Sequence, residues 1–205
     1  MVGRINLKML AIVVSLATIL FAQEEILTFI PNVQLTFLLV CCYGATVGLG
    51  YGTMIIGIHV ILDNIVMGSL TPFIMIPQFI GLFIALLFGY LFRNKNEYIQ
   101  AIFSAIAVLL YSWAFIPFNI FYFNVKFIPY LIADIPFELI LVVTSLVTII
   151  LLYKPIVTTI NRLMENMLQK EPINNLGTRT NNNDIIITVR KEEDENEKSR
   201  DNKRA

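Results

Sequence analysis

The chain has 205 residues, 57% of them hydrophobic, and its 15 basic and 15 acidic side chains give a formal net charge of zero. A balanced charge provides no general attraction to nucleic acid. Apolar runs of about 18 residues or more exclude an ordinary soluble domain and are typical of membrane-spanning helices.

Six apolar segments predict an all-α, polytopic membrane protein built as a bundle of six transmembrane helices. In chain order they cover residues 7–22, with an extension to 30, then 31–43, 51–67, 73–92, 99–118 and 129–153. The second and third segments are short for a hydrocarbon layer about 30 Å thick. The glycine-rich sequence GATVGLGYG joins them into a hairpin, so we expect their two polar ends on the same side of the membrane.

Charged residues between the segments indicate the orientation of the bundle. With six spans, one side of the membrane receives most of the basic residues near the segments, which are Arg4, Lys8, Arg93, Lys95 and Lys154. The other side receives five acidic residues and one basic residue, which are Glu24, Glu25, Asp63, Asp134, Glu138 and Lys126. Cytoplasmic loops are enriched in Lys and Arg, so this pattern predicts that both termini are cytoplasmic.

Composition divides the chain into three regions. Residues 1–154 form the predicted six-helix transmembrane domain. Residues 155–170 carry apolar side chains at helical spacing, which predicts a cytoplasmic amphipathic helix on the membrane surface or on a partner. Residues 171–205 are rich in Asn and then in charge, so they have too little apolar surface to offset the entropy of ordering, and we expect a disordered tail.

Two carboxylates lie close together at the start of the sixth segment. Asp134 and Glu138 are four residues apart, so they share one face of a helix. A charged carboxylate at mid-membrane costs about 2.5–3.5 kcal/mol on insertion scales, so we expect both to face the bundle interior or water. They either contact a ligand or serve the helix itself, with Asp134 as a cap and Glu138 at the lipid headgroups.

Polar residues also stand at both ends of the predicted hairpin. Asp63 and Asn64 close the third segment, where they either end a helix in water or contact a ligand. Asn32 and Gln34 follow Pro31, which interrupts a helix and frees backbone groups. Irregular backbone within a membrane is tolerated where it lines a cavity, so this segment favours a pocket.

Trp113 begins a cluster of aromatic residues at the end of the fifth segment. Such clusters mark a membrane interface, and the same rings could also stack on an aromatic ligand. Ala11 and Ser15 form a small-xxx-small pair in the first segment. The pair either packs within the bundle or provides a docking face for another membrane protein.

The sequence gives little support to metal or enzyme chemistry. His59 is the only histidine, and no second ligand stands at metal spacing, so we expect no metal ion and no cofactor. Glu24 and Glu25 are adjacent acids, but a single His cannot complete the ligand set of a membrane metalloprotease. We therefore expect a protein without catalytic activity.

The sequences FIPNVQLTFLLV, HVILDNIVMG and YLIADIPFELI resemble the substrate-binding S components of energy-coupling factor (ECF) transporters. The resemblance covers about residues 7–163. It implies a six-helix bundle in a bacterial plasma membrane that binds a vitamin or related micronutrient from outside and delivers it inward by toppling. It also implies a transmembrane T component and two ABC ATPases as partners, with Ala11 and Ser15 docking on the T component.

The resemblance further implies a set of ligand-binding positions. They are Asn32, Gln34, Asp63, Asn64, Gln78, Trp113, Asn119, Asp134 and Glu138. The acidic residues among them favour a ligand with a cationic or donor-rich end. Two other functions stay open, namely a solitary membrane carrier or channel and a membrane assembly or scaffold protein acting through its tail.

Overall fold

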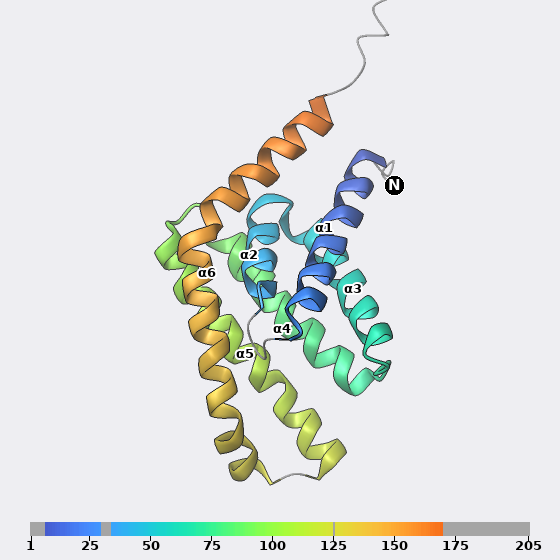
Figure 1. Cartoon of the computed structure of the whole chain (residues 1–205), viewed down its shortest axis with the longest axis vertical. Coiled ribbons are helices and arrows are strands. Elements are labelled where there is room, and N and C mark those ends of the chain that lie inside the picture. The colour runs from blue at the N-terminus through green and yellow to red at the C-terminus, as the bar shows by residue number, and fades with distance from the viewer. Residues whose placement is uncertain (1–6, 30–33, 125, 170–205) are drawn as a thin grey trace, which may run out of the picture. The chain divides into compact units, whose positions relative to one another are not determined.

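A computed structural model describes residues 7–29, 34–124 and 126–169, and these residues form helices and no strand. The helices are α1 (Leu7–Leu27), α2 (Thr36–Thr46), α3 (Gly48–Val66), α4 (Pro72–Leu91), α5 (Glu97–Phe123) and α6 (Phe127–Gln169) (Figure 1). All except α2 are long and apolar enough to cross a membrane. The described chain is therefore a helical membrane protein, as the apolar segments predicted.

The shortest helix, α2, lies at the centre of the bundle. It contacts α1, α3, α4 and α5, and every residue from Thr36 to Gly44 is buried. Its 11 residues fall short of the roughly 20 that a helix needs to span a bilayer. Because α2 is apolar around its whole circumference, it is suited to a position surrounded by protein, where neighbouring helices can satisfy its ends.

The predicted glycine-rich link is almost entirely helical. The α2 helix continues to Thr46 and α3 begins at Gly48, so only Val47 lies between them. Gly48 has a φ of 79°, a backbone conformation that side chains with a Cβ rarely adopt, and this allows the abrupt reversal. The hairpin was therefore predicted correctly, but its helix boundaries were wrong because Gly44 and Gly52 lie within helices, where they pack against α4.

Two glycines allow α2 and α4 to approach closely. A Cβ at Gly44 would overlap the backbone of Leu86, and a Cβ at Gly89 would overlap the backbone of Cys41. Small residues permit this kind of backbone-to-backbone contact in membranes, where dispersion forces drive helix association. Cys41 itself is fully buried and has a free thiol.

The α6 helix is longer than predicted. We expected a span over residues 129–153 followed by a separate amphipathic helix over 155–170, but the structure has one helix from Phe127 to Gln169. Pro155 lies inside it and removes one backbone hydrogen bond, and the helix changes direction in its C-terminal part (Figure 1). Lys154 pairs with Glu97 of α5 at 2.7 Å. The predicted tail, residues 171–205, lies outside the described residues.

Candidate functional site

Most of the buried polar side chains gather at one end of the bundle. Helices α1, α3 and α5 finish at this end, and α2, α4 and α6 begin there (Figure 1). We call it the polar end and define it by Glu24, Thr36, Asp63, Gln78 and Asp134. The alternating direction of the helices thus brings together residues from five of the six helices, namely α1, α2, α3, α4 and α6.

The first polar group joins α3 to α4. Gln78 donates from Nε2 to Oδ2 of Asp63 at 2.7 Å, and its Oε1 accepts a hydrogen bond from Nδ2 of Asn64 at 2.6 Å. Asn64 also donates to the backbone oxygen of Val60, and its Oδ1 accepts from Ser69. Asp63 is 9% exposed and Asn64 1%, so the alternative prediction, that these residues simply end a helix in water, is wrong.

The second polar group joins α1, α2 and α3. His59 is fully buried, and its Nε2 lies 3.0 Å from Oε2 of Glu24. The two atoms lie within ion-pair distance, although neither ring nitrogen of His59 makes a hydrogen bond with any described group. On the other side, Gln23 donates from Nε2 to Thr36 Oγ1 at 2.8 Å, and Thr36 in turn lies 3.4 Å from Gln34 Oε1. The Thr36 hydroxyl also lies 3.5 Å from Glu24 Oε2, so the carboxylate of Glu24 stands between Thr36 of α2 and His59 of α3.

The third polar group lines a cavity between α5 and α6 of about 260 Å³. Its lining mixes aromatic and polar side chains, which are Tyr111, Ser112, Phe115, Asn119, Tyr130, Asp134, Phe137, Glu138 and Leu141. Asn119 donates from Nδ2 to the Tyr130 hydroxyl at 2.7 Å. Glu138 is 8% exposed, and its Oε1 has no hydrogen-bond partner within the described part of the chain.

Tyr111 lies between these polar groups. Its ring meets the ring of Phe37 edge to face, with centroids 5.2 Å apart, and it also lines the α5–α6 cavity. The carboxylates of Glu24 and Asp63 both lie within electrostatic range of its hydroxyl. A ligand in the cavity would therefore share one wall with both buried networks.

The predicted site residues fall into two clusters rather than one. Asp63, Asn64 and Gln78 form the network between α3 and α4, whereas Asn119, Asp134 and Glu138 line the cavity between α5 and α6. Trp113 is 48% exposed and lies beside Glu138 rather than inside the cavity. Gln34 stands next to Thr36, and Asn32 lies outside the described residues.

Sequence reasoning missed several residues of the three polar groups, among them Glu24, Thr36, His59, Tyr111 and Tyr130. It treated Glu24 as half of an acidic pair and His59 as a lone histidine, although the two side chains meet. The sequence could have indicated both residues, because a titratable side chain within an apolar membrane helix usually has a polar partner. What the sequence lacked was the contact between α1 and α3 that makes them partners.

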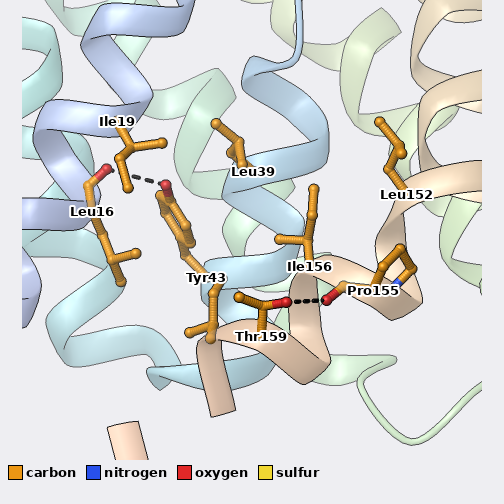
Figure 2. A pocket seen from close by; sticks show the side chains of 9 residues that line it. Leu16, Ile19, Leu39, Tyr43, Leu152, Pro155, Ile156 and Thr159 are labelled. Atoms are coloured by element: carbon orange, nitrogen blue, oxygen red, sulfur yellow. Dashed lines mark hydrogen bonds between the residues drawn. The ribbon is translucent and has the colours of Figure 1, made fainter. Parts of the chain in front are cut away.

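A second cavity, of about 390 Å³, lies toward the opposite end between α1, α2 and α6 (Figure 2). Figure 2 shows Leu16, Ile19 and Tyr43 on one side of it and Leu152 and Ile156 on the other. The polar atoms that reach it are already bonded within the chain, since the Tyr43 hydroxyl donates to Leu16 O at 3.1 Å. The Thr159 hydroxyl donates to Pro155 O at 2.8 Å. This cavity offers apolar contact and no charge.

The small-residue pair of α1 faces away from the bundle. Ala11 and Ser15 are both exposed, and the Ser15 hydroxyl donates to Ala11 O at 2.9 Å, which leaves a smooth surface. Ile19 continues the same row at the next i+4 position and borders the apolar cavity. The reading of the pair as packing inside the bundle is therefore wrong.

Among the described residues, no three His, Cys, Asp or Glu side chains converge as a metal site would require. Comparisons with protein-family models, with curated proteins and with solved structures found no match.

Proposed function

We propose that this chain captures a small organic molecule at the polar end of its bundle and works as the substrate-binding S component of an ECF transporter. In this proposal the polar end faces outward, both termini are cytoplasmic, and a T component with two ABC ATPases supplies the energy. The ligand is a vitamin or related micronutrient. The protein itself carries out no chemical reaction.

One observation carries the proposal. A cavity with two carboxylates, an amide and several aromatic rings opens at the same end as two buried polar networks. Ligand sites are mostly apolar concavities in which a few fixed polar groups orient the bound molecule. Polar side chains inside a membrane bundle are costly, so their concentration at one end favours a binding or transport site over simple packing.

The charge distribution supports the proposed orientation. Lys154 and the two residues Arg93 and Lys95 lie at the end of the bundle opposite the polar end. Basic residues are enriched on the cytoplasmic side of membrane proteins, so the polar end would face outside. A ligand would then enter from the exterior, as uptake requires.

The exposed row on α1 supports the proposed partner. Ala11, Ser15 and Ile19 offer a smooth strip that leads into the apolar cavity bordered by Leu152 and Ile156. Small-xxx-small strips allow the backbone of a second helix to approach closely. A transmembrane helix of the T component is the partner that this strip fits.

The ligand is tested by purifying the chain from native membranes and analysing extracted small molecules by mass spectrometry. We expect one organic compound at about one molecule per protein and a thermal shift when that compound is added back. A protein that releases no compound, and that no member of a vitamin panel stabilises, would overturn the proposal.

The partner is tested with bulky substitutions on α1. We expect Ala11→Trp and Ser15→Trp to abolish co-purification of an ATPase through an affinity tag, because the indole ring would hold the partner helix away. Ligand binding should be unchanged, since both residues are exposed in the first half of α1, whereas the polar end lies where α1 finishes. The matched control is Ile102→Trp, at an exposed position of α5.

Two outcomes would contradict this part of the proposal. Loss of ligand binding in the Ala11 and Ser15 variants would mean that the strip belongs to the bundle. Wild-type protein that binds its ligand but never captures an ATPase would point to a solitary carrier.

A further inference from the structure

The α5–α6 cavity has an unbalanced charge. Asp134 and Glu138 both line it, and no Lys, Arg or His is among its lining residues in the described part of the chain. The carboxylates of Asp134 and Glu138 both lie within electrostatic range of the Tyr130 hydroxyl. All three residues therefore lie close together on one face of α6. Two neighbouring carboxylates in a medium of low dielectric constant repel each other and favour a cation between them.

Glu138 has unused bonding capacity inside this cavity. It is more than nine-tenths buried, and its Oε1 meets no donor among residues 7–29, 34–124 and 126–169. Asn119 Nδ2 is engaged with the Tyr130 hydroxyl, and the Trp113 indole N–H interacts with the Glu138 carboxylate from beside the cavity, not from within it. A buried carboxylate oxygen without a donor is costly, so a ligand that supplies an N–H group would stabilise it.

The remaining walls favour the same kind of ligand. The rings of Tyr111, Phe115, Tyr130 and Phe137 surround the two carboxylates. Aromatic faces attract cations through their quadrupole and also stack on flat rings. The volume of about 260 Å³ limits the ligand to a small molecule.

We infer that the cavity between α5 and α6 binds a small aromatic cation whose ammonium or amidinium group donates a hydrogen bond to Glu138. Asp134 supplies a second negative charge one helical turn before Glu138, and the aromatic side chains hold the flat part of the molecule. This assignment rests on the proposed function and narrows its ligand to a charge class.

The test uses three probes that share one ring and differ in charge, namely tryptamine, tryptophol and indole-3-acetate. Binding to the full chain in lipid nanodiscs is measured by calorimetry or ligand-observed NMR. We expect tryptamine to bind at least tenfold more tightly than neutral tryptophol, a difference of about 1.4 kcal/mol. We expect indole-3-acetate to bind most weakly, because its carboxylate would meet Asp134 and Glu138.

Two variants locate the effect. Glu138→Gln should remove the preference for tryptamine while leaving the weak binding of tryptophol unchanged, and Asp134→Asn should reduce the preference in part. The matched control is Glu165→Gln, an equal charge change at an exposed position of the same helix. Without a ligand, Glu138→Gln should melt at the same temperature as wild type or higher, because it removes a buried charge that lies near Asp134 and has no cation among the lining residues.

Three results would overturn the inference. They are equal or tighter binding of tryptophol or indole-3-acetate, a preference for tryptamine that survives Glu138→Gln, and no binding of any probe up to about 10 mM.

Failure of the proposed function would look different. If the native ligand is neutral or anionic, only this inference is wrong. If tryptamine binds in a Glu138-dependent way but the protein holds no native ligand, only the uptake proposal is wrong.

Discussion

Gln78 uses both ends of its side-chain amide inside the bundle. It donates to Asp63 and accepts from Asn64, so one residue of α4 holds two adjacent residues of α3. The amide is the group that suits this position, because it offers a donor to the carboxylate and an acceptor to the second amide at once. Each hydrogen bond contributes modestly to stability, but an unpaired partner left in the bundle is costly.

The change Gln78→Leu tests this arrangement. We expect the free energy of unfolding to fall by about 1–3 kcal/mol, because Asp63 and Asn64 would both lose a partner in a buried position. The measurement is thermal or denaturant unfolding in detergent micelles. The matched control is Asn161→Leu, which removes an amide at an exposed position of α6 and should change stability little. Equal effects of the two substitutions would mean that the hydrogen bonds of Gln78 to Asp63 and Asn64 do not stabilise the protein.

Glu24 and Glu25 provide an internal comparison between neighbouring carboxylates. Glu24 lies 3.0 Å from the buried ring of His59, whereas Glu25 Oε1 is buried without a hydrogen-bond partner among the described residues. We expect Glu24→Gln to destabilise the protein by about 1–3 kcal/mol and Glu25→Gln to be neutral or stabilising. Unfolding of the two variants side by side checks this. A larger loss of stability for Glu25→Gln than for Glu24→Gln would mean that the contact between Glu24 and His59 does not stabilise the protein.

At the scale of elements, the contact between α2 and α4 decides how the centre of the bundle is built. Gly44 and Gly89 bring the two backbones together, so α2 can lie among the other helices despite its length. Gly57 of α3 differs, because a Cβ there would meet no atom within 4 Å. The same residue type therefore has a packing role at two positions and none at the third.

Alanine substitutions separate these roles. Gly44→Ala and Gly89→Ala should each destabilise the protein by about 1–3 kcal/mol, because the added methyl group would overlap a backbone that cannot move aside. Gly57→Ala should be neutral or stabilising by up to about 1 kcal/mol, since alanine is the better helix former. Melting temperatures of the three variants check this. Tolerance of Gly44→Ala would show that α2 and α4 lie farther apart.

At the scale of the whole molecule, the sequence predicted a helical membrane protein because long apolar runs have few alternatives in a membrane. Of the six predicted spans, the second is a helix of only 11 residues, so five of the described helices are long and apolar enough to cross. It placed Asp134 and Glu138 on one face, since their spacing alone fixes that. It could not pair Glu24 with His59 or Gln78 with Asp63, because those contacts depend on how separate helices pack. The ends of α2 and α6 were mispredicted for a similar reason, since glycine and proline mark turns in water but are tolerated within membrane helices.

Site-directed labelling tests the orientation of the molecule. Leu70→Cys lies in the link between α3 and α4 and Lys95→Cys in the link between α4 and α5, at opposite ends of α4. We expect an impermeant maleimide to label Leu70→Cys from outside intact cells and Lys95→Cys only after permeabilisation. Native Cys41 and Cys42 are fully buried and should stay unlabelled. Labelling of both introduced cysteines from one side would contradict the orientation.

The length of α6 has a mechanical consequence. Its 43 residues correspond to about 65 Å, roughly twice the thickness of the hydrocarbon layer. Glu138 lies near the beginning of this helix, and Lys154 lies past its middle, where its ion pair with Glu97 connects α6 to α5. A tilt at one end of α6 is therefore transmitted to the other end along one continuous helix. Pro155, which follows the ion-paired Lys154, is the point in the C-terminal part where the helix can bend.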